Sequence, residues 1–452
     1  MLSRSGGSRR THIFLRRKQR TLSDTRAAGG EFDLLTFQSD IMHQLFVTSL
    51  LVRLCLMEHC HGNSSLGNSL NDLHTRFGVS LYQTLTETEN NSNLIMSPAS
   101  ISLCLGLLQL GARGNTLAQL EGTLGYDVND ARVRDVLSQP QGDLGNSSDG
   151  VRLQLANAIF VQSGVKLLPE FTQHALEWGN SSLLSVNFSN SNHTQLHKWA
   201  RYQNKVEDKL QIKEDTLQSG GLWEEMPMLP HMALVSTVVF HGAWQKQFHF
   251  SETQNLPFIL TDGSTVKVPM MYQSTEVNFG KRRRKNEQPY TVLELPYLDR
   301  SLRLLVALPS DRKTPLSQLE SQLTARAVGL WDTVLRRTKM DIFLPRFKME
   351  SRFNLKSVLQ YLGVSDVFSP SAADFRGISD GERLFVSEAF HEARIEVTED
   401  GTKASSATAM VLLKRSRSAV FKADRPFLFI LRHISTGSLL FIGRVLNPAE
   451  MQ

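Results

Sequence analysis

Continuous apolar runs of strand length dominate the second half of the chain. They read "LQLANAIFV", "ALVSTVVFHGAW", "VLELPYL", "LRLLVALP" and "MDIFLPRF". Near the end, "PFLFILRH" and "SLLFIGRVLNP" flank Ser435, Thr436 and Gly437, which predicts a β-hairpin whose strands are apolar on both faces. Strands of that kind must be covered on both sides, so the chain needs sheets that lie beneath other elements.

Helical periodicity appears earlier in the chain. Leu73, Phe77, Leu81 and Leu85 recur at helical spacing, and "SPAS" supplies a cap and an early proline for a second helix over residues 101–110. Helices first and strands later predict an α+β domain. We expect a single domain over residues 63–452, because no repeat and no long linker interrupts it.

The first 62 residues differ from the rest of the chain. Residues 1–41 are polar, basic and aperiodic, which predicts a disordered extension that carries most of the net charge of +6. The body of the protein is therefore not expected to bind nucleic acid. Residues 42–62 form a short apolar stretch that Arg53 interrupts before the length of a membrane span, so we expect a secretory signal peptide and no membrane anchor. A buried amphipathic segment is the alternative, and translation from Met1 or from Met42 stays open.

Several features favour secretion. Six N-x-Ser/Thr sequons predict a glycosylated surface: Asn63, Asn90, Asn146, Asn180, Asn187 and Asn192. Once the signal peptide is removed only Cys104 remains, so no internal disulfide is expected. Cysteine and histidine nowhere adopt metal-ligand spacing, and we expect neither a metal nor a cofactor.

From about residue 70 to the end, the chain carries ordered motifs of a known family. They are "NLIMSPASISLCLGLLQLGARGNT", "FHGAWQKQF", "VPMM", "LELPY", "LPRFKMESRFNLKSVLQYLGV", "FVSEAFHEARIEV" and the terminal hairpin. Together they resemble the serpins, and the residues around the hairpin are most similar to the plasminogen-activator-inhibitor clade. The resemblance implies helices packed around three β-sheets, with an exposed reactive-centre loop at about residues 399–421. It implies a monomeric inhibitor of proteases, not an enzyme.

In serpins a protease cleaves this loop, and the freed segment then inserts into the central sheet as an extra strand. The sequence suits insertion, because alternate residues from Thr402 to Met410 are small or uncharged and no proline occurs between Thr402 and Leu413. The hinge and inserting residues that the resemblance implies are Glu399, Gly401, Thr402, Ala404, Ser406 and Thr408.

The spacing of the family's loop places the reactive bond between Arg415 and Ser416, with Arg417 and Lys414 as alternative reactive residues. An arginine there suits a trypsin-like serine protease, which would be held as a covalent acyl-enzyme. A serpin-fold carrier or binding protein, whose loop is only a substrate, is the alternative function.

The resemblance also implies a set of residues that gate the central sheet: Asn93, Ser97, Pro98, Ser100, His391 and Trp244. The sequence departs from the family pattern beside them. Ser236 stands where relatives usually place an asparagine, and residues 200–232 lack the usual threonine-glycine-lysine run. These departures leave the speed of trapping open.

Two other motifs allow more than one interpretation. "KRRRK", made of Lys281, Arg282, Arg283, Arg284 and Lys285, could bind heparin or another polyanion, or form a solvated loop. Gly377, Ser379 and Gly381 spell the G-x-S-x-G motif of hydrolases. That motif needs a strand before it and a helix after it, whereas the strand-like "LFVSEAF" follows here, so we predict a simple turn.

Overall fold

The computed structural model describes residues 70–89, 91–135, 137, 150–178, 181–188, 199, 231–284, 287–298, 300–400 and 419–451. All of these belong to one compact unit, Ser64–Gln452. The N-terminal extension, the signal peptide and loop residues 401–418 lie outside the described residues and stay predictions.

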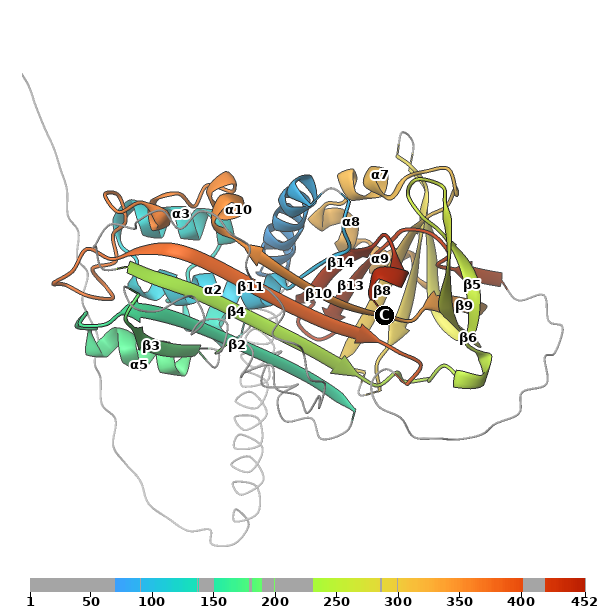
Figure 1. Ribbon diagram of the computed structural model, residues 1–452, viewed down its shortest axis with the longest axis horizontal. Helices are drawn as coiled ribbons and strands as arrows, with labels where there is room; N and C mark the ends of the chain where they lie inside the picture. The colour runs from blue at the N-terminus through green and yellow to red at the C-terminus, as the bar shows by residue number, and fades with distance from the viewer. Residues whose placement is uncertain are drawn as a thin grey trace, which may run out of the picture. The chain divides into compact units, whose positions relative to one another are not determined.

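A five-stranded sheet forms one part of this unit. Its strands follow the order β10-β11-β4-β2-β3, and three of them run side by side across the molecule in Figure 1. Their bounds are β10 (Phe347–Asn354), β11 (Phe385–Val397), β4 (His231–Gly242), β2 (Val151–Gln162) and β3 (Ser181–Val186). The β4·β11 pair is parallel, whereas β2·β4 and β10·β11 are antiparallel.

The other described strands join into one nine-stranded sheet, where the family resemblance led us to expect two. The long strand β6 is the reason, since its successive parts pair with β5, β9 and β7 and so link both sets of strands. The order is β1 (Leu94–Met96), β14 (Leu439–Val445), β13 (Phe427–His433), β8 (Leu302–Pro309), β7 (Tyr290–Pro296), β6 (Thr265–Arg282), β9 (Arg336–Pro345) and β12 (Ala419–Lys422), with β5 (Gln254–Ile259) on β6.

The described helices include two that the sequence predicted. Residues 70–88 are helical, and α2 (Pro98–Gly111) begins at the N-cap Ser97, whose side chain accepts a hydrogen bond from the Ser100 amide. The others are α3 (Gly114–Leu124), residues 131–135, α5 (Pro169–Glu177), α7 (Leu316–Ser321), α8 (Ala325–Gly329), α9 (Trp331–Val334) and α10 (Lys356–Tyr361), with 3-10 turns η1 (Phe250–Glu252), η2 (Asp366–Phe368) and η3 (Pro448–Met451).

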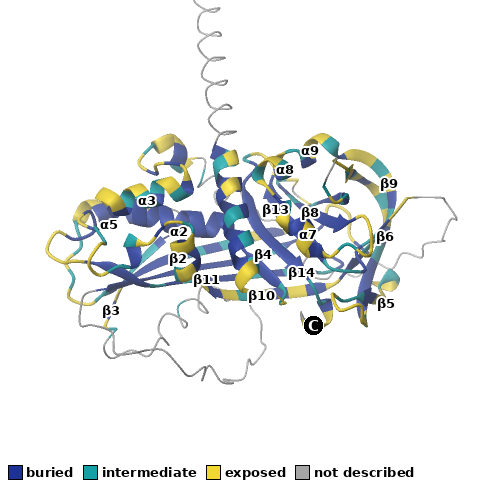
Figure 2. Cartoon of the chain, turned by 90° about the horizontal axis from the view of Figure 1, so that it is seen from above, coloured by how far each residue is buried: buried dark blue, intermediate teal, exposed yellow. Residues whose placement is uncertain are grey.

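Helix α2 lies at the centre of the core. Every one of its residues is buried, as the dark blue of Figure 2 shows, and it contacts β14 on one side and both β4 and β2 on the other. A helix that is apolar or small all round is typical of complete burial. Because α2 lies against both sheets, its first turn places Ser97 and Ser100 beneath the middle of the β4·β11 pair.

The predicted terminal hairpin is confirmed. Strands β13 and β14 are antiparallel neighbours with every residue buried. Gly437 adopts φ of 71° in the turn, a left-handed conformation that glycine tolerates without steric cost. Within the described ranges, no helix has both the length and the apolar character that crossing a membrane requires.

Candidate functional site

The candidate site is the boundary between the parallel strands β4 and β11. Backbone pairing there extends from His231 opposite Phe385 to Phe240 opposite Ile395, with one irregularity between Val386 and Glu388. The segment predicted to become the reactive loop leaves from the end of β11. A strand that enters the sheet between β4 and β11 would have to separate this pair.

A buried polar network crosses the boundary at its middle. Nδ1 of His391 on β11 lies 3.2 Å from the hydroxyl of Ser236 on β4, and these residues are direct neighbours in the register. The Ser236 hydroxyl lies 2.7 Å from that of Ser100 in α2. Nε2 of His391 accepts a hydrogen bond of 3.0 Å from the Ser97 amide. The network therefore connects both strands to the first turn of α2.

The hydrogen bonds define the protonation of His391. Since an amide donates to Nε2, that nitrogen carries no proton, and Nδ1–H is left to donate to Ser236. Burial lowers the pKa of His391 to about 3, although its hydrogen-bonded contact with Ser236 acts in the opposite direction. The imidazole is therefore neutral at physiological pH, which suits a structural histidine better than a catalytic base.

Asn157 of β2 extends the network to a third strand. It is the register neighbour of Ser236, and its Oδ1 lies 3.5 Å from the Ser100 hydroxyl, at the outer limit of a hydrogen bond. Its buried Nδ2 has no partner among the described residues. An asparagine side chain at position 236 would be longer than serine and would carry its own amide into this space. The departure of Ser236 from the family pattern thus lies within the network itself.

A second cluster holds the end of β11, where the loop begins. The indole Nε1 of Trp244 donates to the carbonyl of Thr398 at 2.8 Å, and its amide donates to that of Asp400 at 3.1 Å. The Trp244 ring stacks on Tyr297 with centroids 4.5 Å apart and an interplanar angle of 19°. The Phe248 amide adds a bond of 2.9 Å to the carbonyl of Glu399. Backbone and aromatic contacts thus fix the last residues before the loop.

Glu399 itself is fully buried. Its Oε1 accepts a hydrogen bond of 2.8 Å from the Thr253 hydroxyl and lies 3.7 Å from the Arg346 guanidinium. Its Oε2 is buried and finds no partner among the described residues. Burial, followed by the nearby Glu399 charge, raises the pKa of Asp400. Burial and the neighbouring carboxylate thus both disfavour the ionised form of Asp400.

The structure brings together only part of the predicted gate. Ser97, Ser100 and His391 meet in the network, and Pro98 occupies the first turn of α2 above them. Trp244 lies instead at the end of β11, with Glu399. Asn93 is also elsewhere, since its Oδ1 accepts from the amides of Leu446 and Asn447 at 2.7 and 3.0 Å. Asn93 and Trp244 thus lie apart from His391, and their role in gating the sheet stays a prediction.

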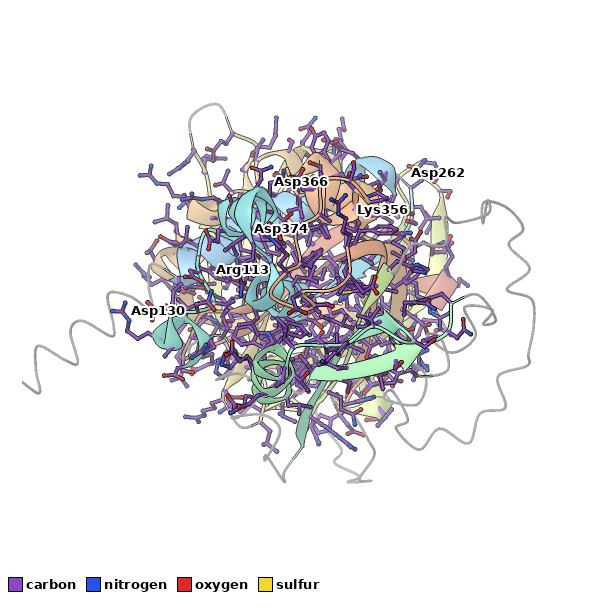
Figure 3. The ribbon with its side chains drawn as sticks, turned by 90° about the vertical axis from the view of Figure 1, so that its left-hand side faces the viewer. Arg113, Asp130, Asp262, Lys356, Asp366 and Asp374 are labelled. Carbon is purple, nitrogen blue, oxygen red and sulfur yellow. The ribbon has the colours of Figure 1, made fainter. Side chains whose placement is uncertain are left out.

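The G-x-S-x-G segment is a turn, as predicted. It lies in irregular structure ahead of β11, and its amide at Gly377 donates to the carbonyl of Gly111 at 3.0 Å. A Cβ on Gly377 would come within 2.6 Å of the Arg113 guanidinium, the end of a flexible side chain that would have to shift to make room for it. Figure 3 shows Arg113 close to Asp374, whose carbonyl accepts a bond of 2.9 Å from the Arg113 amide. Nothing in this arrangement forms a nucleophile elbow.

The remaining predicted residues fall in different places. Loop residues Gly401, Thr402, Ala404, Ser406, Thr408, Lys414, Arg415, Ser416 and Arg417 lie outside the described residues, as do Lys285 and five of the sequons, namely Asn63, Asn90, Asn146, Asn180 and Asn192. Asn187 is exposed directly after β3. Lys281, Arg283 and Arg284 are exposed around the end of β6, and Arg282 is half-buried between them.

Comparison with known proteins places these features in a family. A model of the serpins, serine protease inhibitors, matches residues 72–448. The protein called "Probable serpin E3" of Danio rerio is 76% identical over 416 residues, which make up 91% of this chain and 100% of that protein. Plasminogen activator inhibitor 1 of Sus scrofa is 32% identical over 378 residues, 83% of this chain and 92% of that protein.

A solved structure gives the same result. The chain resembles that of native protease nexin-1 with heparin, with a TM-score of 0.74 and 30% sequence identity over 84% of this chain and 100% of the other. The predicted α+β serpin fold and the similarity to plasminogen activator inhibitors are confirmed. This chain belongs to the serpin family of serine protease inhibitors.

Proposed function

We propose that the protein is a secreted suicide inhibitor of an arginine-specific, trypsin-like serine protease. The observation that carries this proposal is the parallel β4·β11 pair, with the reactive segment attached directly to the end of β11. A segment that turns back from β11 would run antiparallel to β11 and, since β4 and β11 point the same way, antiparallel to β4 as well. Antiparallel pairing is slightly more stable per residue than parallel pairing, so insertion would replace one weaker ladder by two stronger ones.

The dimensions of the chain support insertion. Residues 402–413 form twelve positions free of proline, and β4 is also twelve residues long. At roughly 3.4 Å per residue, an extended segment of this length would span about 40 Å and could pair along the whole of β4. Its alternate residues Ala404, Ser406 and Thr408 are small enough to enter the layer above α2 without an unpaired charge.

Trapping would proceed by interrupted hydrolysis. The protease serine would attack the carbonyl carbon of Arg415, an acyl bond would form and the Arg415–Ser416 peptide bond would break. The released amino group of Ser416 would take up the proton from the protease's catalytic base. Insertion of the freed segment would then carry the acyl-enzyme away before water completes the second step. Arg415 would fill a specificity pocket that contains a carboxylate, by a charge-assisted contact.

Secretion, glycosylation and a monomeric state belong to this proposal. The apolar stretch at residues 42–62 and the sequons support secretion, and the exposed Asn187 is an accessible acceptor for a glycan. A sulfated polysaccharide is a further proposed partner, because a structural neighbour, protease nexin-1, was solved with heparin. The chain also offers a run of basic residues beginning at Lys281.

The test is incubation with arginine-specific serine proteases, followed by denaturing electrophoresis. The proposal predicts a complex of added molecular mass that survives boiling, is absent in Arg415→Ala and persists in Arg417→Ala. If only Arg417→Ala abolishes the complex, the reactive bond follows Arg417 and not Arg415. Proteases that cleave the loop and remain active throughout would favour the alternative, a serpin-fold carrier.

A further inference from the structure

An open hollow of about 720 Å³ lies at the end of β6, beside β12, which follows the reactive segment. Four stretches of chain line it: residues 279–283, 289–291, 308–312 and 420–425. Six of the side chains that line it are cationic, and they are Lys281, Arg282, Arg283, Arg312, Lys422 and Arg425. We call this feature the basic hollow.

The Asp424 carboxylate forms ion pairs with three of these cations. The Asp424 side chain is buried, and its Oδ2 lies 2.7 Å from the Arg312 guanidinium and 3.8 Å from Nζ of Lys422. Its Oδ1 lies 3.1 Å from the Arg425 guanidinium. A single negative charge cannot neutralise three positive ones, so this wall of the hollow retains positive charge.

The positive charges of Lys281, Arg282 and Arg283, which also line the hollow, are compensated less still. Lys281, Arg282 and Arg283 form no ion pair with any residue in the described part of the chain. The Nε and one terminal nitrogen of Arg282 are buried, and neither has a hydrogen-bond partner among those residues. Buried guanidinium N–H groups without an acceptor are costly, and an anion in the hollow that accepts hydrogen bonds from them would reduce that cost. Arg284 is different, because it pairs with Glu287 at 3.2 Å.

The hollow is built by fixed contacts across strands. Lys281 and Arg282 lie opposite Thr291 and Tyr290 in the β6·β7 ladder, which sets their spacing. The Phe279 and Phe421 rings meet edge to face with centroids 6.3 Å apart and connect β6 to β12. Arg425 donates to the carbonyl of Pro309 and so ties the chain after β12 to the end of β8. The backbone positions that carry the cations are therefore set before any ligand arrives, which lowers the entropic cost of binding.

We propose that the basic hollow binds a sulfated polysaccharide chain. Four of its six cations are arginines, whose planar forks match sulfate oxygens in pairs, and the hydroxyls of Thr291 and Ser310 suit the hydroxyl groups of a sugar. A single-stranded nucleic acid fits less well. Its bases need exposed aromatic faces, and Phe421 is buried while Phe279 is packed against it.

This inference rests on the polysaccharide partner proposed above and adds its location. The site includes Arg312, Lys422 and Arg425, which are distant in sequence from the run at Lys281. Val420 and Lys422 belong to the strand that begins a few residues after the proposed reactive bond. A bound polysaccharide would therefore lie close to any protease that occupies the loop.

The experiment compares two variants of the full chain on immobilised heparin and by titration with heparin in solution. The first is Lys281→Gln/Arg282→Gln/Arg283→Gln, which removes three of the six cations that line the hollow. The second is Lys166→Gln/Arg326→Gln/Lys348→Gln, which removes three exposed cations that do not line it. We expect about a hundredfold weaker binding for the first variant and less than about threefold for the second.

Further binding measurements test the location of the site and the choice of ligand separately. Arg312→Gln removes an exposed cation that pairs with Asp424. It should weaken heparin binding by roughly fivefold and lower the salt dependence of the affinity. Desulfated heparin should bind far more weakly than heparin.

If both triple variants elute with the parent chain, the proposed location is wrong while the proposed partner stands. If the parent chain binds no heparin, both are wrong. Equal or tighter binding of single-stranded DNA would overturn the choice of ligand. Covalent trapping without heparin should be the same in all variants.

Discussion

The hydroxyl of Ser236 lies 3.2 Å from Nδ1 of His391, and this contact joins the two strands between which a reactive segment would insert. Ser236→Ala removes the acceptor of the imidazole N–H and a partner of the Ser100 hydroxyl, and it leaves both buried. We expect the native form to lose about 1–3 kcal/mol of stability, because buried polar groups without partners carry a desolvation cost. The urea midpoint of unfolding checks this.

The adjacent Thr237 provides the control. It is equally buried on the same strand, and its hydroxyl makes only a long contact of 3.5 Å to the carbonyl of Ala156. Thr237→Val should therefore cost clearly less than Ser236→Ala. Equal losses would mean that the network around His391 contributes nothing beyond ordinary packing.

The stability of the native form should depend on the protonation of His391. Burial lowers its pKa to about 3, whereas an unfolded histidine titrates near 6.5. Between these values the unfolded chain binds a proton that the native form does not. The stabilisation that comes from keeping His391 neutral is therefore fully present above about pH 6.5 and is lost as the pH falls toward 3. At pH 5 the free energy of unfolding should be lower by about 2 kcal/mol. His74, whose pKa burial lowers to about 4, acts in the same direction.

Urea midpoints measured from pH 8 to pH 5 test this dependence. His391→Gln keeps an acceptor and a donor in the network but cannot titrate, so the fall in stability toward pH 5 should be smaller than in the parent chain. His174→Gln removes an exposed histidine and should leave the pH profile unchanged. The explanation fails if both variants follow the parent profile.

Trp244→Phe should loosen the start of the reactive loop. The substitution removes the indole donor to the carbonyl of Thr398 and part of the stacking on Tyr297, at a cost of about 1–3 kcal/mol. Hydrogen exchange of the amides at positions 244 and 248, which donate to the carbonyls of Asp400 and Glu399, should become faster, because a looser segment holds these bonds less firmly.

Trp331→Phe is the matched control for Trp244. Trp331 is also buried, and its indole donates to the Tyr290 hydroxyl at 3.0 Å, far along the chain from the loop. This variant should lose similar stability without faster exchange of the amides at positions 244 and 248. Faster exchange in both variants would indicate a general loosening of the fold.

Much of the fold could be predicted from the sequence because its signals are local. The apolar runs correspond to β2, β4, β7, β8 and β9, and the cap at Ser97 begins α2 where expected. The number of sheets could not be predicted in this way. It depends on the continuity of β6, which pairs with three different partners along its length.

The candidate site could be predicted from the sequence only in part. Motif order identified His391 and Ser97, but it could not separate the network at mid-strand from the Trp244 cluster at the strand's end. Ser236 was recognised as a departure from the family, and its hydrogen bonds became visible only when strand register placed it opposite His391. The basic hollow was incomplete in the sequence, since tertiary packing brings Arg312 to Asp424 and brings residues 420–425 to the run at Lys281.

In the proposed mechanism, trapping requires the cleaved segment to enter between β4 and β11. The most direct measurement is the ratio of covalent complex to cleaved, uncomplexed chain after reaction with one arginine-specific protease. Thr408→Arg would place an unpaired charge on the inward face, and Ser405→Arg would place the same side chain on the outward face. We predict that Thr408→Arg is cleaved without forming complex, while Ser405→Arg forms complex like the parent chain. Undiminished complex with Thr408→Arg would show that trapping does not require the segment to enter between β4 and β11.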